Sequence, residues 1–515
     1  MNAVRFACGL ACLVLSMAGR AASVELVTSA WDDASPAGGR LIDISTDGRF
    51  VVFESDASNI VKGDTNGVTD VFLRDRATAI TTRVSVSSAD VQANGPSGGA
   101  GSVTPDGRFV SFSSAASNLV TGDTNGLADV FVRDTVAGTT ERVSISTAGG
   151  QGNGPALASI LSDDGRFVLF DSEASNYFRS ESWAPTVYVR DRLHGTTGVA
   201  GDDYRTSECN LGGFSADGNL AAFHCRKAKW EVYVRNLTDG TVGRVTKFPQ
   251  DSSNVSWVSD LSGDGRYVAF TTDAKVVPAD TNGTFDAYIY DRKTRVFDLV
   301  SKTQAGAAGN NSSGPASVSD DGRFVAFFSW ASNLVDGDER GTADGFVRDR
   351  FGKTTTRMTG SSFGGLGAGG RILISGDGRT TAFTTDVNHF VANDTNDQDD
   401  TFVATNAFDV SGSFTVRPRT LYFAALPVGS RSPPQAVTIT NTGSTDLAIA
   451  WIHLVTADAD EFHRVRRNCP EVLPVAQQCT VAVTFAPVTP GSHEARLAVA
   501  AGGRRQSVTL IGVAQ

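Results

Sequence analysis

The stretch Ser45-Thr46-Asp47-Gly48-Arg49-Phe50-Val51-Val52-Phe53 recurs, with small changes, seven times in this chain of 515 residues. An Asp-Gly pair suits the tight turn of a β-hairpin, because glycine adopts a positive φ without steric cost. The apolar run that follows the pair predicts a strand buried on both faces. The copies lie 47 to 59 residues apart, and their glycines are Gly48, Gly107, Gly165, Gly218, Gly265, Gly322 and Gly378.

Each repeat has room for four short strands. In the first repeat we expect them at Leu41–Ile44, Phe50–Glu54, Val71–Arg74 and Thr82–Val86. A four-stranded meander that repeats along a chain is the blade of a β-propeller. The sequence therefore predicts an all-β fold whose first domain, residues 24–408, is a seven-bladed β-propeller with four-stranded blades.

The seventh repeat has no fourth strand of its own, because a different pattern begins after its third strand. A lone strand, Val24–Thr28, precedes the first repeat. Its residues Glu25-Leu26-Val27 lie 21 to 23 residues before Gly48, and Val84-Ser85-Val86 lie at the same distance before Gly107. We therefore expect the N-terminal strand to close blade seven, which leaves no sheet edge of the ring unpaired.

Residues 1–21 have the layout of a secretory signal peptide. Arg5 precedes an apolar stretch over 6–17, and small residues lead to a cleavage point after Ala21. An alternative interpretation is a lipoprotein signal with Cys12 as the lipidated residue. The signal peptide predicts an exported protein, periplasmic or extracellular, and no later segment has the about 20 apolar residues that a membrane span needs.

Export places the remaining cysteines in an oxidising compartment, where disulfides form. Cys209 and Cys225 fall in one repeat, and Cys469 and Cys479 are ten residues apart in the tail. Two local disulfides are the simplest of the connectivities that these residues allow. Four buried thiols are the alternative.

The net charge limits the choice of partners. The chain has 45 Lys and Arg against 56 Asp and Glu, which gives a formal net charge of −11. Nucleic-acid-binding proteins present a basic face to the phosphate backbone. The sequence therefore excludes nucleic acid as an expected partner and favours cations.

A second domain begins near residue 413, after a linker at 409–412 where the repeats end. Its short strand-like segments, separated by frequent turns, predict a β-sandwich over residues 413–515. The expected strands are Ser413–Val416, Thr420–Phe423, Ala436–Thr440, Leu447–Trp451, Cys479–Phe485, Ala495–Val499 and Ser507–Ile511.

The repeats resemble the TolB-like, or WD40-like PD40, β-propeller repeats of exported bacterial proteins, and the resemblance covers residues 24–408. Such propellers serve as binding platforms, as partner domains of peptidases and as surface modules. The resemblance therefore implies a fold and leaves the activity open.

The second domain is similar to immunoglobulin-like domains of the choice-of-anchor D or ASPM-SPD-2-Hydin type. The similarity rests on Val437-Thr438-Ile439-Thr440-Asn441-Thr442-Gly443 and on Val483-Thr484-Phe485-Ala486-Pro487. In that family a cysteine pair flanks the turn before the Phe-Ala-Pro strand, which Cys469 and Cys479 match. The resemblance implies a structural or adhesive module.

Four repeats carry one acidic loop between their second and third strands, Asp-Thr-Asn with a further Asp four residues after the Asn. Oxygen ligands at this spacing are typical of the first half of an EF-hand Ca²⁺ loop. We expect Ca²⁺ there, with backbone carbonyls and water completing the shell; alternatively, the side chains close Asx turns. The residues are Asp64, Asn66, Asp70; Asp123, Asn125, Asp129; Asp280, Asn282, Asp286; and Asp394, Asn396, Asp400.

The acidic loops are unevenly distributed. Repeat six has a degraded copy between Asp338 and Asp344, and repeats three and four have none. The loops thus form one arc of the ring, and Trp183 and Trp230 lie in the gap. Because binding residues concentrate on loops, we expect a ligand where the arc meets the gap.

Catalytic motifs are weak. Gly95-Pro96-Ser97-Gly98-Gly99 matches a nucleophile elbow only by its letters, and the six histidines have no zinc-type spacing. The sequence favours a non-enzymatic binding or surface-interaction protein with a protein or glycan ligand on the propeller loop face. The alternative is a metal-dependent propeller enzyme, a carbohydrate lyase or hydrolase that uses the acidic loop residues.

Overall fold

The computed structural model describes residues 24–515 except 32–35, 178–185, 202–207, 227, 248–254, 339–341, 359–370, 387–389, 391–393, 395, 397, 406–413, 443–445, 456–457 and 502–503. The described chain consists of β-strands and one short 3-10 helix, η1 (Ala459–Glu461), which confirms the predicted all-β class. The predicted signal peptide and the predicted linker at 409–412 lie outside the described residues.

Among the described residues, the strands up to Thr405 form seven units of four strands, and each unit contains one copy of the repeated stretch. Units 1 to 3 are β2 (Arg40–Ile44), β3 (Phe50–Ser55), β4 (Asp70–Asp75), β5 (Ile80–Arg83); β6 (Ser97–Val103), β7 (Phe109–Ser114), β8 (Asp129–Asp134), β9 (Thr139–Arg142); and β10 (Ala156–Leu161), β11 (Phe167–Ser172), β12 (Thr186–Asp191), β13 (Thr196–Val199). Units 4 and 5 are β14 (Glu208–Phe214), β15 (Leu220–Arg226), β16 (Trp230–Asn236), β17 (Val242–Arg244); and β18 (Ser256–Leu261), β19 (Tyr267–Thr272), β20 (Asp286–Asp291), β21 (Val296–Leu299). Units 6 and 7 are β22 (Ser313–Val318), β23 (Phe324–Ser329), β24 (Asp344–Asp349), β25 (Thr354–Arg357); and β26 (Ile372–Ile374), β27 (Thr380–Thr385), β28 (Asp400–Thr405) with β1 (Val24–Leu26).

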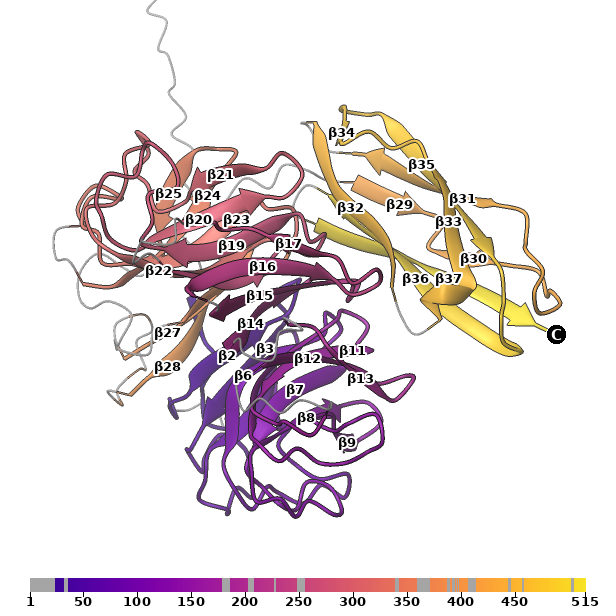
Figure 1. Cartoon of the computed structure of the whole chain (residues 1–515), viewed down its shortest axis with the longest axis horizontal. Coiled ribbons are helices and arrows are strands. Elements are labelled where there is room, and N and C mark those ends of the chain that lie inside the picture. Colours follow the sequence, from indigo (N-terminus) through magenta and orange to yellow (C-terminus); the bar gives the residue numbers. More distant parts are fainter. Residues whose placement is uncertain are drawn as a thin grey trace, which may run out of the picture.

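The units are arranged in a closed ring (Figure 1). The first strand of each unit contacts the first strand of the next, and β26 of unit 7 contacts β2 of unit 1. In units 2 and 3 these strands also pair in parallel, with Ala158 opposite Ala100. The first strands therefore surround the axis of the ring.

The repeated Asp-Gly turn joins neighbouring units. Gly107 has a φ of +72°, and a Cβ at this position would lie 2.6 Å from the ring of Phe50, which belongs to the same motif in the preceding unit. A Cβ at Gly165 would likewise collide with the ring of Phe109. Successive turns are also hydrogen-bonded, as from Ala216 N to Gly263 O. The glycine thus serves both the turn and the close packing of units.

The N-terminal strand completes unit 7, as predicted, because β1 pairs with β28. The register differs from the predicted one by two residues. Leu26 lies opposite Phe402, just as Arg83 lies opposite Phe72 in unit 1, so Thr28 takes the place of Ser85. Thr28 is 20 residues before Gly48, whereas Ser85 is 22 before Gly107, because the link into unit 1 is shorter.

The C-terminal part has two sheets around one hydrophobic core, to which both contribute, for example Val481 and Leu497. Two of its strands, β33 and β34, were not predicted from the sequence. The first sheet contains β29 (Phe414–Arg417), β31 (Gln435–Asn441), β35 (Gln478–Phe485) and β33 (Phe462–Arg467). The second contains β30 (Thr420–Tyr422), β37 (Arg504–Ala514), β36 (Gly491–Ala501), β32 (Leu447–Val455) and β34 (Val472–Leu473).

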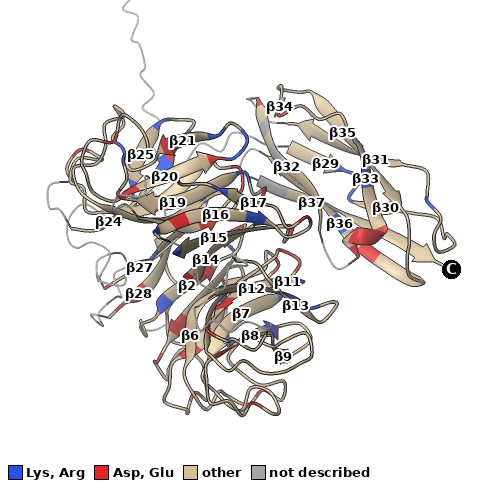
Figure 2. Cartoon of the chain, in the orientation of Figure 1, with Lys and Arg blue, Asp and Glu red and all other residues tan. Residues whose placement is uncertain are grey.

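Both expected cysteine pairs are at bonding distance. Cys209 and Cys225 are cross-strand neighbours in unit 4, and Cys469 and Cys479 are joined in the C-terminal part. No helix of the described residues is long and apolar enough to cross a membrane. Acidic and basic residues are interspersed over both parts of the molecule (Figure 2).

The C-terminal part packs against the end of the ring that carries the Asp-Gly turns, which we call the turn face. Trp451 is 2% exposed and clusters with Ala216 of that face. His453 Nδ1 lies 3.1 Å from Asp217 Oδ2, and Arg166 pairs with Asp460. The opposite end of the ring, the loop face, carries the loops between second and third strands and the links between units.

Candidate functional site

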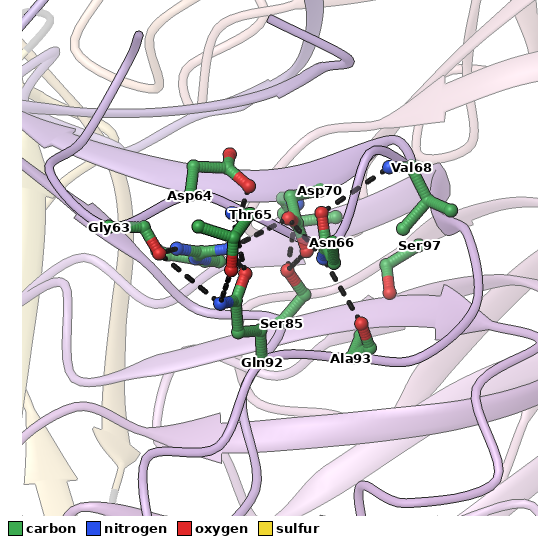
Figure 3. A network of polar contacts seen from close by, with 12 residues as sticks. Gly63, Asp64, Thr65, Asn66, Val68, Asp70, Ser85, Gln92, Ala93 and Ser97 are labelled. Atoms are coloured by element: carbon green, nitrogen blue, oxygen red, sulfur yellow. Dashed lines mark hydrogen bonds and ion pairs between the residues drawn. The ribbon is translucent and has the colours of Figure 1, made fainter. Parts of the chain in front are cut away.

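The acidic loop of unit 1 folds back on itself through its asparagine (Figure 3). Asn66 Nδ2 donates to Asp70 Oδ2 at 2.8 Å and to the carbonyl of Ala93 at 3.0 Å. The backbone N–H of Val68 donates to Asn66 Oδ1 at 3.3 Å, which closes an Asx turn. The asparagine therefore holds the loop against the link to unit 2.

A guanidinium lies between the two carboxylates of this loop. Arg83 Nη1 is 3.1 Å from Asp64 Oδ1 and 3.0 Å from Asp70 Oδ2, and it also donates to Gln92 Oε1 at 2.7 Å. The Arg83 side chain is 9% exposed and that of Asp70 is fully buried. Unit 1 thus supplies its own cation to the place that the sequence interpretation assigned to Ca²⁺.

The same arrangement recurs in two further units. Arg142 of unit 2 is 3.1 Å from each of its carboxylates, and Arg357 of unit 6 is 3.3 and 3.7 Å from the pair there. Burial raises the pKa of Asp64, and the Arg83 charge opposes the rise. The paired carboxylates are Asp123 and Asp129 in unit 2, and Asp338 and Asp344 in unit 6.

Unit 5 has the loop without the arginine. Its equivalent of Arg83 is Leu299, which is 2% exposed. The Tyr288 hydroxyl donates to Asp280 Oδ2 at 2.6 Å, and the Ser301 hydroxyl donates to Asp286 Oδ1 at 2.6 Å. Burial raises the pKa of Asp286 to about 6, with the Ser301 hydrogen bond opposing the rise.

Unit 7 also has a leucine, Leu26, at the arginine position. The Thr28 hydroxyl donates to Asp400, and burial raises the pKa of Asp400. Asn396 Oδ1 accepts the N–H of Gln398 at 3.0 Å. Part of the loop around Asp394 lies outside the described residues. The predicted residues thus meet within the loops of units 1, 2 and 5, and each loop belongs to a separate unit.

A second group of charged residues lies on the strands around the axis. Asp43 of β2 and Asp260 of β18 stand at the same place in their repeats, five residues before the motif glycine. Each accepts a backbone N–H from the next unit, from Val103 and Val318, at 2.9 Å. Burial raises the pKa of both carboxyls to about 6, while the positive charge of Arg371 opposes the rise.

Exposed aromatic rings occur at the loop-face ends of units 5 and 6. Trp257, in β18, is 40% exposed and stacks on Phe285 with ring centroids 5.0 Å apart. Trp330, which follows β23, is also 40% exposed and meets Phe328 edge-on. By contrast, Trp230 of the expected aromatic gap packs on His224, and Trp183 lies outside the described residues.

A cavity of about 360 Å³ opens where unit 7 meets unit 1 on the loop face. Arg40 and Asp399 line it and pair at 2.8 Å. Glu54, also in its lining, accepts the N–H of Gly99 at 2.8 Å and acts electrostatically on Arg371. The cavity is therefore linked to the charged residues around the axis.

Two features of these sites were missed in the sequence. Arg83, Arg142 and Arg357 each lie 13 residues after the last loop aspartate, so an alignment of the fourth strands would have found them. The exposed Trp257 has no tryptophan counterpart in the other repeats; for example, Gly314 stands in its place in unit 6 and Gly99 in unit 2. No sequence signal marks it as exposed.

The chain matches no protein-family model and no curated protein. Its fold is similar to solved structures at low identity. TolB from Acinetobacter baumannii shares 16% identity over 62% of each chain with a TM-score of 0.35, so this chain spans less than two thirds of TolB. Oligogalacturonate lyase from Vibrio parahaemolyticus shares 11% identity over 75% of this chain and 96% of that chain, with a TM-score of 0.47. At such identities the likeness concerns the fold alone.

Proposed function

We propose that the chain is an exported, non-enzymatic binding protein that takes a glycan at the loop-face opening of its ring. The seven units are the blades of a seven-bladed β-propeller, and the C-terminal sheets form an immunoglobulin-like sandwich. The cyclic contacts of the first strands support the propeller, and the shared core of the two sheets supports the sandwich. Two disulfides suit an oxidising compartment, periplasmic or extracellular.

The exposed stack of Trp257 on Phe285 is the observation that carries this proposal. An aromatic face offers apolar area of defined geometry to the C–H face of a sugar ring. Binding pockets combine such surfaces with a few polar groups that fix orientation, and they measure about 300–1,000 Å³. Around the axis, Asp43, Asp260 and Arg371 supply hydrogen-bonding groups, and the neighbouring cavity of about 360 Å³ falls in that range.

The position of the C-terminal part supports the loop face as the ligand-binding face. Trp451 and His453 contact the turn face, where Trp451 is almost fully buried. A ligand that approaches the axis from the turn face would meet this domain first. The loop face, which carries Trp257, is therefore the accessible route.

A carbohydrate hydrolase or lyase is the second candidate. A carboxyl group with a pKa near 6 exchanges protons close to neutral pH and so suits general acid–base catalysis. Asp43 and Asp260 both have this property and lie on the strands around the axis. The same carboxyl groups and the neighbouring Arg371 are equally suited to holding a ligand by hydrogen bonds, so binding remains the first proposal.

A glycan array followed by calorimetry tests the proposal. We expect the wild-type chain to retain a glycan and to release it uncleaved. We expect Trp257→Ala to bind about 5- to 13-fold more weakly, because stacking on one aromatic ring contributes about 1–1.5 kcal/mol. Trp31→Ala is the matched control, since Trp31 is an exposed tryptophan, 53% exposed, outside units 5 and 6. Equal affinity of Trp257→Ala and the wild type would contradict the binding site. Cleaved glycans, lost with Asp260→Asn, would favour the enzyme instead.

A further inference from the structure

The acidic loops fall into two kinds that differ at one position of the fourth strand. Arg83, Arg142 and Arg357 face the third-strand aromatic residue of their units, as Leu299 faces Tyr288 in unit 5. Because the cross-strand register is the same, Leu299 replaces the arginine at an equivalent place. Unit 5 therefore keeps both loop carboxylates and lacks their resident cation.

The polar surroundings of the loop change along with the arginine. In unit 1, Gln92 binds Arg83 and lies opposite Val86; in unit 5 the corresponding residue is Ala308, opposite Lys302. Lys302 pairs with Asp298 at 2.7 Å, so its charge is neutralised by a carboxylate outside the loop. No other described lysine or arginine forms an ion pair with the carboxylates of unit 5.

One carboxylate oxygen of unit 5 is left without a partner. Asp286 is 0% exposed, and its Oδ2 has no hydrogen-bond partner, whereas the corresponding Oδ2 of Asp70 binds both Asn66 and Arg83. In unit 5 the asparagine amide, Asn282 Nδ2, donates to the carbonyl of Gly309 at 2.8 Å, just as Asn66 Nδ2 donates to Ala93 in unit 1. Asn282 lies near enough to lower the pKa of Asp286, but it forms no hydrogen bond to Oδ2. An unsatisfied buried charge is costly, which favours occupation by a counter-ion.

We propose that the acidic loop of unit 5 binds one divalent cation, Ca²⁺, between Asp280 and Asp286, where an arginine lies in units 1, 2 and 6. The donors are carboxylate and amide oxygens, the ligands that Ca²⁺ prefers. Gly283, with a φ of +68°, makes the sharp turn that brings them together. This proposal is independent of the glycan site, because the loop lies outside the axial strands.

The number of charged ligands sets the expected affinity. Within the described parts of the chain, no group of three or more His, Cys, Asp or Glu is placed to hold a metal ion. The two carboxylates of unit 5 must therefore be supplemented by neutral oxygens such as Asn282 Oδ1, backbone carbonyls and water. Sites with few charged ligands in extracellular modules have dissociation constants of about 10⁻⁴ to 10⁻³ M.

Calorimetric titration with Ca²⁺ and terbium luminescence test the proposal on the full chain. Tyr288 donates to Asp280 and so lies beside the proposed ion, where its excitation sensitises bound Tb³⁺. We expect the wild type to bind Ca²⁺, and Leu299→Arg and Asp286→Asn each to lose one equivalent and most of the Tb³⁺ signal. Val296→Arg is the matched control, because Val296 lies in the same strand and is 57% exposed.

Two results would overturn the proposal. The first is no Ca²⁺ heat and no Tb³⁺ signal from the wild type at concentrations up to about ten times the weaker expected dissociation constant. The second is an unchanged stoichiometry in Asp286→Asn. That variant is nearly isosteric, so it decides the matter even where Leu299→Arg fails to fold. Glycan binding in the presence of EDTA is read separately and reports only on the axial site.

Discussion

The acidic loops of units 1 and 5 share the Asp-x-Asn-x3-Asp pattern and differ in whether an arginine of the same unit pairs with their carboxylates. In unit 1, Arg83 reaches from the fourth strand and bridges Asp64 and Asp70. In unit 5, Leu299 occupies that strand position, and a tyrosine hydroxyl takes up part of the hydrogen bonding. The comparison shows that a loop pattern alone does not identify a metal site, because a residue 13 positions away decides whether the carboxylates are already neutralised.

Burial raises the pKa of one aspartate in each of these two loops, and of the two only unit 1 has a cation that opposes the rise. In unit 1, Arg83 counteracts the effect of burial on Asp64. In unit 5 burial raises the pKa of Asp286 to about 6, and no cation contributes to lowering it. We therefore expect the loop of unit 1, with its arginine, to stabilise the metal-free protein at neutral pH, and the loop of unit 5, without one, to lower its free energy of unfolding.

Replacing Arg83 with leucine should have the largest effect on stability. The change leaves two buried carboxylates without a cation, and breaking a buried ion pair in this way costs about 3–5 kcal/mol. Thermal unfolding followed by circular dichroism measures the loss, and added Ca²⁺ should recover part of it because the loop then resembles that of unit 5. Arg40→Leu is the control, since Arg40 is 61% exposed and its pair is worth about 0–1 kcal/mol. Equal losses in the two variants would contradict the role of Arg83.

Asp286→Asn should stabilise the metal-free protein at pH 7.5. Its pKa is about 6 in the folded chain against an ordinary aspartate value of 3.8, so the folded state holds the proton more tightly. Wild-type stability should therefore fall as pH rises from about 4 to 6, by about 2–3 kcal/mol, and Asp286→Asn should remove this fall. Urea unfolding with EDTA at pH 4 and 7.5 measures the difference. Asp70→Asn is the contrast, and a gain in stability there would undermine the comparison.

Tyr288→Phe should have the smallest effect. It removes the hydroxyl that donates to Asp280 at 2.6 Å and should cost about 1–2 kcal/mol without metal, because the acceptor is a buried carboxylate. Tyr290→Phe, two residues along the same strand, serves as the control. Chemical unfolding with EDTA gives both values, and a Tyr288→Phe loss no greater than that of the control would show that the hydroxyl does not replace the arginine.

The repeated stretch made the all-β fold predictable because its glycine has two local tasks, the turn and the contact with the preceding unit. Gly107 against Phe50 is such a contact, and both residues belong to the motif. The N-terminal strand was assigned to unit 7 correctly, but its register was off by two residues. The prediction counted residues back from the motif glycine and so assumed that the link into unit 1 is as long as the link into unit 2. Strand β33 was missed because its histidine and arginines conceal the alternation of a strand, and β34 because it is only two residues long.

The candidate sites were less predictable because they depend on contacts between strands. The acidic loops were recognisable from spacing, but their arginines became visible only when β4 and β5 were paired. Trp257 stands out through its exposure beside Phe285, which no single repeat reveals. Asp43 and Asp260 share a position in their repeats, yet their surroundings arise from neighbouring units.

Anomalous diffraction from crystals soaked in Tb³⁺ in place of Ca²⁺ tests the central claim most directly. If arginine and a metal ion are alternatives for the same pair of carboxylates, a peak will lie within about 2.3–2.6 Å of oxygens of Asp280 and Asp286. No peak will lie between Asp64 and Asp70, where Arg83 is bound. A peak in unit 1, or none in unit 5, would contradict the account.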